Sequence, residues 1–415
     1  MVEVLKPERG GLGARGRVAR LLADPPALAV LALCAAVLGL RRAEAMSRPQ
    51  FWAEDVIFYQ RALLQGWQAF LGTDAGYFHM VLRAVAAAGA SVDPSLAPAV
   101  FVGAAALITL YVASRTLSRR CPLPRYAGLC ALAIVLVPDT HEVLLNVVNL
   151  QWVLGAGLVL LLLSGDPVGP GSWAHDLVAA LALGLTGPFS IFLAPAFALR
   201  AISRRSRASL VICALICACA LVQAYLVYVE PTSPFDTTGA AASAGLFLPA
   251  IGRRLGGSPM MGAFLARDTD QVFGTLAGIL TLAGIGYLSL GPGSYRVERR
   301  LLGLVLAVVL AGALYRTRHS LFLFFVPHTR ARYFYLPQLF TLWLLISWAV
   351  QKGRAARVCA ALALWALAVN LPRLREAPLK DLNWPSYAEK IRAGEDVTVE
   401  TNPPVWRTHF PRREK

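Results

Sequence analysis

Charged side chains are scarce in this chain of 415 residues. Asp, Glu, Lys and Arg make up only 15% of the sequence, whereas 57% of the residues are hydrophobic. A soluble domain carries about 25% charged residues, so this shortage excludes an ordinary soluble globular protein. The hydrophobic residues instead gather in runs close to the length of about 20 residues that a helix needs to cross a bilayer. The composition therefore predicts an all-α polytopic membrane protein.

Three further features are missing. The formal net charge is +16, but no motif typical of RNA- or DNA-binding proteins accompanies it. The seven cysteines lie in apolar runs or beside predicted cytoplasmic loops, and they indicate no disulfide framework. The basic N-terminus lacks a clear small-residue cleavage site, which favours an uncleaved first helix over a signal peptide.

About eleven apolar spans alternate with polar segments. They cover positions 21–40, 96–117, 126–138, 147–163, 176–186, 189–202, 209–229, 272–290, 301–315, 333–350 and 358–371. The fifth and sixth spans are short and are separated by Gly187-Pro188, so they form either one broken helix or a tight hairpin. Residues 1–371 therefore constitute a predicted transmembrane module.

The distribution of Lys and Arg predicts the orientation of these spans. Arg clusters occupy every second loop, for example Arg115, Arg119 and Arg120, and then Arg200 and Arg204. The positive-inside rule places these loops and the N-terminus in the cytoplasm and the C-terminus outside. Apart from the loop around Asp166, the cytoplasmic loops carry little besides Arg, which suits anionic lipid. The expected location is thus the cell membrane, with multiple passes.

Two outer segments are long enough for structure of their own. The first outer loop, 41–94, has apolar residues at helical spacing over 54–64 and 77–83, which predicts two amphipathic helices along the membrane surface. The tail, 372–415, keeps aromatic and β-branched residues, including an extended stretch at 397–399. It is expected to be a small ordered extracytoplasmic appendage.

Polar side chains that could catalyse a reaction or bind a ligand gather on the predicted outer side. Polar groups at membrane depth are costly and usually functional. The candidates are Glu54, Asp55, Tyr77, His79 and Arg83 from the first loop, His141, Glu142, Asn146, Asn149, Gln151 and Trp152 before and in the fourth span, and His328, Arg330, Arg332, Tyr333 and Tyr335 at the tenth.

Structural interpretations of the same residues stay open. Glu54-Asp55 could be a solvated loop pair, or a charge pair at a helix N-terminus. Asn146, Asn149 and Gln151 could hydrogen-bond across helices. The arginines near position 330 could bind lipid headgroups.

Three short segments resemble known enzymes. Phe51-Trp52-Ala53-Glu54-Asp55, the segment from Asn146 to Trp152 and Arg332-Tyr333-Phe334-Tyr335-Leu336-Pro337 look like those of bacterial membrane proteins of the GT-C glycosyltransferase class. The number of spans, the acidic first outer loop and the outer C-terminal appendage are similar as well. The resemblance implies a GT-C-like fold and a membrane enzyme that uses polyprenyl-phosphate-linked sugars.

The resemblance also implies roles for the candidate residues. An acidic residue of the first loop, Asp55 before Glu54, would be the general base that takes a proton from the acceptor hydroxyl. Arg330 and Arg332, with His328, would bind the donor phosphate, and the remaining aromatic, amide and charged candidates would bind substrate. A divalent metal, Mg or Mn, could be held by one of the two acids, but no required metal is expected.

The implied reaction transfers a sugar to an extracytoplasmic acceptor, a cell-envelope glycan, lipid or protein, with inversion. Two rival functions stay open. A transporter or flippase for lipid-linked saccharides would show inverted repeats and charges near the bilayer midplane, whereas a non-catalytic envelope-assembly subunit would tolerate loss of the acid pair.

Overall fold

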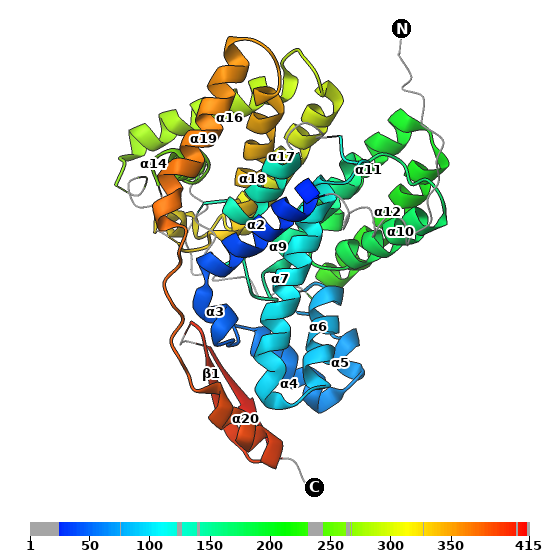
Figure 1. The fold of residues 1–415 in the computed structure, drawn as a ribbon, viewed down its shortest axis with the longest axis vertical. Coiled ribbons are helices and arrows are strands. Elements are labelled where there is room, and N and C mark those ends of the chain that lie inside the picture. Colours follow the sequence, from blue (N-terminus) through cyan, green and yellow to red (C-terminus); the bar gives the residue numbers. More distant parts are fainter. Residues whose placement is uncertain are drawn as a thin grey trace.

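A computed structural model of the chain describes residues 25–74, 76–122, 127–138, 142–230, 244–262, 266, 268–326, 328–403 and 406–412. The protein is mostly helical (Figure 1), as the composition predicts. A small two-stranded sheet near the C-terminus corrects the all-α expectation.

The long helices follow the predicted apolar runs. They are α2 (Pro25–Arg41), α7 (Ala97–Thr116), α8 (Ala127–Leu136), α9 (Leu150–Leu163), α10 (Pro170–Gly184), α11 (Phe189–Arg204), α12 (Arg207–Val229), α16 (Gln271–Leu290), α17 (Arg296–Arg316), α18 (Arg332–Ala349) and α19 (Arg354–Asn370). Around Gly187-Pro188 the chain forms two separate helices, α10 and α11, and each is longer than the run predicted for it.

Three helices in the described part of the chain are long and apolar enough to cross a membrane. They occupy Pro94–Thr116, Arg207–Val229 and Gln271–Leu290. Others are shorter: the 10 residues of α8 extend about 15 Å, half of a bilayer core of roughly 30 Å. The number of about eleven crossings and their orientation therefore stay predictions.

Helix α9 forms the centre of the core. Every residue of α9 except Gln151 is buried, and a helix that is apolar on all sides requires neighbours all round. Helices α7, α10, α11 and α18 supply them. Gly155 permits close packing, because a Cβ there would lie 2.9 Å from Leu336 on α18 and 3.2 Å from Phe189 on α11.

The first outer loop is helical, as predicted. Helices α4 (Asp55–Gln65) and α6 (Met80–Ala90) pack against each other, with α5 (Gln68–Leu71) between them, α3 (Ala43–Ser47) before them and the short η1 (Pro94–Leu96) leading into α7. The buried face of α4 contains Val56, Phe58, Tyr59 and Ala62. Their position along a membrane surface stays a prediction.

The segment before α16 has structure that the hydrophobic pattern did not indicate. It comprises η3 (Ala244–Leu246), α13 (Phe247–Ile251), a π-helical turn η4 (Gly252–Gly257) and α14 (Ser258–Met261). Glycines allow this segment to contact α16 directly, since a Cβ on Gly252 would lie 1.9 Å from the carbonyl oxygen of Gly274. Two arginines and three glycines in the π-helical turn interrupt any amphipathic pattern there.

The C-terminal segment combines one helix with one hairpin. After η5 (Leu321–Phe325) and η6 (Leu371–Arg373), which flank α18 and α19, the chain forms α20 (Trp384–Ala393), β1 (Val397–Thr401) and β2 (Trp406–Phe410). The strands are antiparallel, with Val397 opposite Phe410 and Val399 opposite Thr408. Strand β1 includes the predicted extended stretch, and β1 and α20 lie at the same end of the molecule as α3 to α6 (Figure 1).

A buried charge cluster joins this C-terminal segment to the end of α2. Arg41, Arg42 and Glu376 are 2%, 3% and 4% exposed. Arg41 Nη2 lies 3.2 Å from one oxygen of Glu376, and Arg42 Nε donates to the other. Arg41 Nη1 also donates to the carbonyls of Val135 and Val137 at the end of α8, at 3.0 and 3.3 Å.

Replacement of Glu376 should therefore destabilise the fold strongly. Glu376→Ala leaves two buried guanidinium groups without their shared carboxylate, a change that costs about 3–5 kcal/mol for a buried ion pair. We expect a lower thermal midpoint in detergent and faster proteolysis of the C-terminal segment. Glu389→Gln on the exposed side of α20 is the matched control, and an equal effect of both variants would contradict the prediction.

Candidate functional site

The two adjacent carboxylates at the start of α4 have different environments. Asp55 is 1% exposed, and its two oxygens accept hydrogen bonds from the backbone N–H groups of Val147 and Val148 at 3.1 and 2.7 Å. Burial raises the pKa of Asp55 to about 7, although the amide donors act in the opposite direction. Asp55 therefore joins α4 to the turn before α9 and has no oxygen free to contact an acceptor hydroxyl.

Glu54 is the more accessible member of the pair. It is half-buried at the N-cap of α4, and among the described residues no other side chain forms a hydrogen bond or an ion pair with its carboxylate. Burial raises its pKa, a hydrogen bond from its own backbone N–H and the charge of Arg332 lower it, and Asp74 and Glu142 raise it. Of the two carboxylates, Glu54 is thus the one more open to a ligand, and the choice of general base between them stays a prediction.

The charges that surround Glu54 come from distant parts of the sequence. Arg332 Nη1 donates to Glu142 Oε2 at 3.1 Å, and its guanidinium lies 5.5 Å from the ring centroid of Tyr333. Asp74 accepts from Arg61 at 3.4 Å. The structure therefore brings the first loop, the segment before α9 and the start of α18 together, as the sequence analysis expected for this side of the protein.

The loop before α18 has a strained backbone. His328 and Arg330 both have positive φ, 63° and 55°, a conformation that non-glycine residues adopt rarely and that clusters at functional sites. Arg330 Nη1 donates to the hydroxyl of Ser320. Its pKa is lowered by burial and by neighbouring charges that include Arg332, so it is a cation held in a partly desolvated position.

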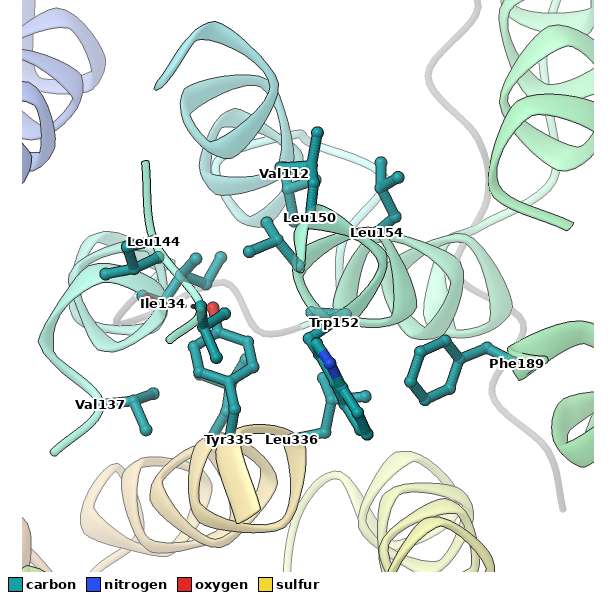
Figure 2. Packing of buried hydrophobic residues seen from close by; sticks show 14 of the residues in the cluster. Val112, Ile134, Val137, Leu144, Leu150, Trp152, Leu154, Phe189, Tyr335 and Leu336 are labelled. Carbon is teal, nitrogen blue, oxygen red and sulfur yellow. Dashed lines mark hydrogen bonds between the residues drawn. The ribbon is translucent and has the colours of Figure 1, made fainter. Parts of the chain in front are cut away.

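Aromatic rings lie beside this charge cluster, and two of them, Trp152 and Phe189, are seen in Figure 2. The ring of Trp152 lies 5.2 Å from Tyr333 and 5.3 Å from Phe189, both edge-on. Trp152 Nε1 is buried and has no hydrogen-bond partner in the part of the chain that the structure describes. Gln151 contacts the Gly187 turn, where a Cβ would lie 2.5 Å from its Oε1.

A second group of candidates holds the first loop against the turn between α10 and α11. The His79 backbone pairs with Thr186, and the N–H of Met80 donates to Leu185 at 3.0 Å. The His79 side chain is 3% exposed, and burial lowers its pKa to about 4, which keeps it neutral. Tyr77 packs edge-on against His79, 6.3 Å between centroids. Burial raises the pKa of Tyr77, while Arg316 acts in the opposite direction.

Arg83 lies deeper than the sequence suggested. It is 4% exposed, donates to the carbonyl of Ala69 and lies over the ring of Phe58 at 5.6 Å. Gly72 packs directly on its guanidinium, 3.1 Å from the position of a Cβ. Arg83 therefore stabilises the packing of α4 on α6, although two of its nitrogens are buried without a hydrogen-bond partner in the described chain.

Three other candidates form hydrogen bonds within the protein, and one candidate lies outside the described residues. Tyr335 is fully buried and donates to the carbonyl of Ile134 at 2.9 Å (Figure 2). The Asn146 side chain donates to the Glu142 carbonyl at 2.8 Å and accepts from the backbone N–H of Asn149 at 3.0 Å, so it stabilises the turn that holds Asp55. The polar groups of Tyr335 and Asn146 are thus occupied by the protein itself, and a substrate-binding role for these two and for Asn149 stays a prediction. His141 lies outside the described residues.

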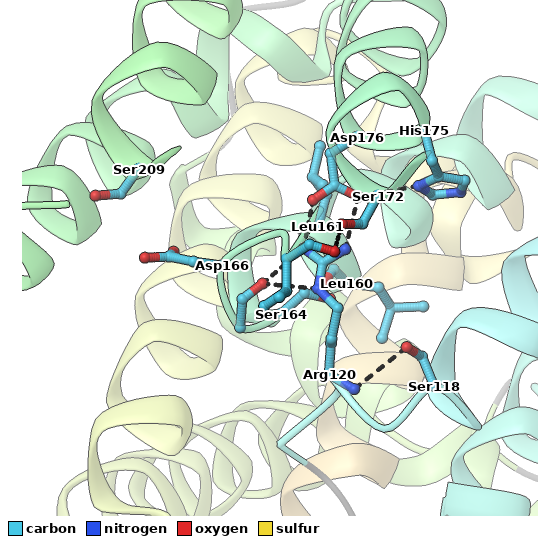
Figure 3. A network of polar contacts seen from close by, with 12 residues as sticks. Ser118, Arg120, Leu160, Leu161, Ser164, Asp166, Ser172, His175, Asp176 and Ser209 are labelled. Carbon is cyan, nitrogen blue, oxygen red and sulfur yellow. Dashed lines mark hydrogen bonds and ion pairs between the residues drawn. The ribbon is translucent and has the colours of Figure 1, made fainter. Parts of the chain in front are cut away.

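A second polar cluster lies around the α9–α10 connection, where the sequence analysis predicted a cytoplasmic loop (Figure 3). Asp176 is fully buried and receives both terminal nitrogens of Arg120, one at 3.1 Å. His175 bonds Asp176 through Nδ1 and the hydroxyl of Tyr111 through Nε2, both at 2.9 Å. Arg120 therefore has a protein partner on α10.

An Asp-x-Asp segment that the sequence analysis overlooked is Asp268-Thr269-Asp270. Asp270 caps α16, since its side chain accepts from the N–H of Phe273 at 2.6 Å. Across the described ranges, no group of three or more His, Cys, Asp or Glu residues is arranged to hold a metal. Near Glu54 the other two acids, Asp74 and Glu142, are paired with arginines, which does not fit a metal site.

Removal of the Asp55 side chain should destabilise the protein in a pH-dependent manner. Asp55→Ala leaves two buried N–H groups without acceptors, at a cost of about 1–3 kcal/mol each. Because the folded-state pKa of Asp55 is raised to about 7 from 3.8, the stability it contributes is full below the lower value and is lost as pH rises through the higher one.

The difference in thermal midpoint between wild type and Asp55→Ala should therefore be larger near pH 5 than near pH 8. Asp381→Asn, at a side chain 60% exposed, serves as the control. A difference that grows with pH would contradict this assignment.

The region around Glu54 thus combines a half-buried carboxylate, two arginines and an aromatic wall from α9, α11 and α18. Comparison of the chain with protein-family models, curated proteins and solved structures found no match.

Proposed function

We propose that this protein is an integral membrane glycosyltransferase that transfers a sugar from a polyprenyl phosphate to an extracytoplasmic acceptor. The observation that carries the proposal is the position of Glu54. Its carboxylate is the only member of the acid pair available to a ligand, and it is electrostatically coupled to Arg332, which lies far away in sequence and beside Arg330.

Glu54 acts as the general base in this proposal. The acceptor hydroxyl oxygen attacks the anomeric carbon, its proton passes to Glu54, and the bond from that carbon to the phosphate oxygen breaks. Attack opposite the leaving group inverts the anomeric centre. A raised carboxylate pKa suits a base, because proton transfer is most efficient when the pKa lies nearer the working pH.

Arg330 and Arg332 stabilise the charge on the departing phosphate. Guanidinium groups donate paired hydrogen bonds to phosphate oxygens, and charge stabilisation of this kind is usually the largest catalytic contribution. Arg332 is already paired with Glu142, so phosphate binding requires Arg332 to share its donors. Trp152, Tyr333 and Tyr77 supply flat apolar surfaces for a sugar ring.

Three membrane-length helices are consistent with a lipid-linked donor, whose chain stays in the bilayer while its phosphate reaches the site. The resemblance of the three segments to GT-C enzymes points in the same direction. A multi-pass arrangement with the site on the outer face completes the proposal, and no step requires a metal.

Glu54→Gln should abolish transfer without unfolding the protein. Loss of a general base lowers the rate by about 10²–10⁴-fold, whereas Gln keeps the size and polarity of the side chain. Purified protein in liposomes is incubated with a panel of polyprenyl-phosphate-linked sugars and a lipid-extract acceptor, and products are identified by mass spectrometry.

Glu389→Gln is the matched control and should retain full activity, since its side chain is exposed on α20. Transfer by Glu54→Gln at the wild-type rate would exclude Glu54 as the base. No product from wild type with any donor would count against a transferase that uses this class of lipid.

A further inference from the structure

The end of strand β1 lies directly against the residues that precede the acid pair. The N–H of Ala53 donates to the carbonyl of Asn402 at 2.6 Å, and the hydroxyl of Thr401 donates to the carbonyl of Ala53 at 3.3 Å. Trp52 and Asn402 also form a parallel bridge. Both backbone groups of Ala53 are therefore held by the C-terminal segment.

Asn402 is itself fixed by its side chain. Its carboxamide accepts from the N–H of Lys380 at 3.1 Å and donates to the carbonyl of the same residue at 2.9 Å. It is 3% exposed. A second link runs through Gln50, whose side-chain oxygen accepts from the N–H of Leu382 at 3.0 Å.

The aromatic contacts behind this pairing are extensive. Phe51 packs edge-on against Trp384 and Phe101, with ring centroids 4.7 and 5.0 Å apart. Trp384 Nε1 donates to the carbonyl of Pro94 at 2.8 Å, and Tyr59 on α4 contacts Phe410 on β2 at 6.1 Å. The C-terminal helix and hairpin are thus packed on the first loop and not attached only at one point.

Ala53 has the backbone conformation that this contact must maintain. Its φ is 45°, a left-handed value that costs a non-glycine residue roughly 1–2 kcal/mol and persists only when surrounding contacts hold it. On the other side, Asp55 is held by Val147 and Val148. Glu54 lies between two residues whose positions are fixed, so the backbone conformation at Glu54 is fixed as well.

We infer that Thr401 and Asn402 are positioning residues for Glu54. They act through Ala53 and orient the carboxylate toward Arg332, so the C-terminal hairpin is part of the site. The effect on the orientation of Glu54 is structural and follows from these contacts. A catalytic role for that orientation rests on the proposed transferase function.

The positioning is tested without any assumption about activity. Glu54→Cys is made alone and together with Thr401→Val or Asn402→Ala, and the rate of alkylation of the new thiol by a membrane-impermeant maleimide is measured by peptide mass spectrometry. We expect alkylation several-fold faster in both double variants, because the loosened backbone exposes position 54. Thr398→Ala, at an exposed position of the same strand, should leave the rate unchanged.

The catalytic meaning is tested with Thr401→Val and Asn402→Ala in the liposome assay. We expect kcat to fall about 10- to 100-fold, as for a misplaced catalytic group, with KM nearly unchanged and Thr398→Ala active. Unchanged alkylation at position 54 in variants that stay folded would overturn the positioning role. Faster alkylation together with no transfer by wild type would uphold the positioning and reject the transferase.

Discussion

The candidate site depends on the buried carboxylate of Asp55 and the two backbone amides that it accepts. One residue fastens the first outer loop to the turn that opens the central helix α9. That turn also carries Glu142, the partner of Arg332. A buried carboxylate is tolerated only when hydrogen bonds satisfy it. These bonds and the Glu142–Arg332 pair together fix three segments relative to one another. The neighbouring Glu54 consequently has a defined position, although in the described part of the chain no other side chain bonds its carboxylate.

Buried arginines perform a related task elsewhere in the fold. Helix C-termini leave carbonyl groups without intrahelical partners, and a cation there also complements the helix dipole. Arg41 donates to carbonyls at the end of α8, Arg200 to Leu161 and Ser164 at the end of α9, and Arg299 to Leu288 and Gly291 at the end of α16. Part of the high positive charge is therefore used to complete helix ends, in addition to the topological role that the sequence analysis gave it.

Hydrophobic periodicity located the long helices, because runs of apolar residues are a local property of the chain. It also located α4, α6 and the extended stretch of β1. It could not distinguish Glu54 from Asp55, since that difference arises from amides almost a hundred positions away in sequence. Periodicity also could not show that Tyr335 is a core residue, because that depends on its hydrogen bond to Ile134. Nor could it locate the π-helical turn η4, which depends on close approach to Gly274.

The division between the two acids follows from desolvation. A fully enclosed carboxylate can satisfy its oxygens only with groups that stay in place, so Asp55 is suited to structure. A proton acceptor must instead remain open to a group that arrives and leaves, and the environment must raise its proton affinity without occupying it. In the proposed reaction this role belongs to Glu54, because burial and two neighbouring acids raise its pKa, while its own backbone N–H and Arg332 lower it. Adjacent residues can therefore hold opposite roles only if the backbone around them is rigid. The contacts of Ala53 with Asn402 on one side, and of Asp55 with Val147 and Val148 on the other, hold it.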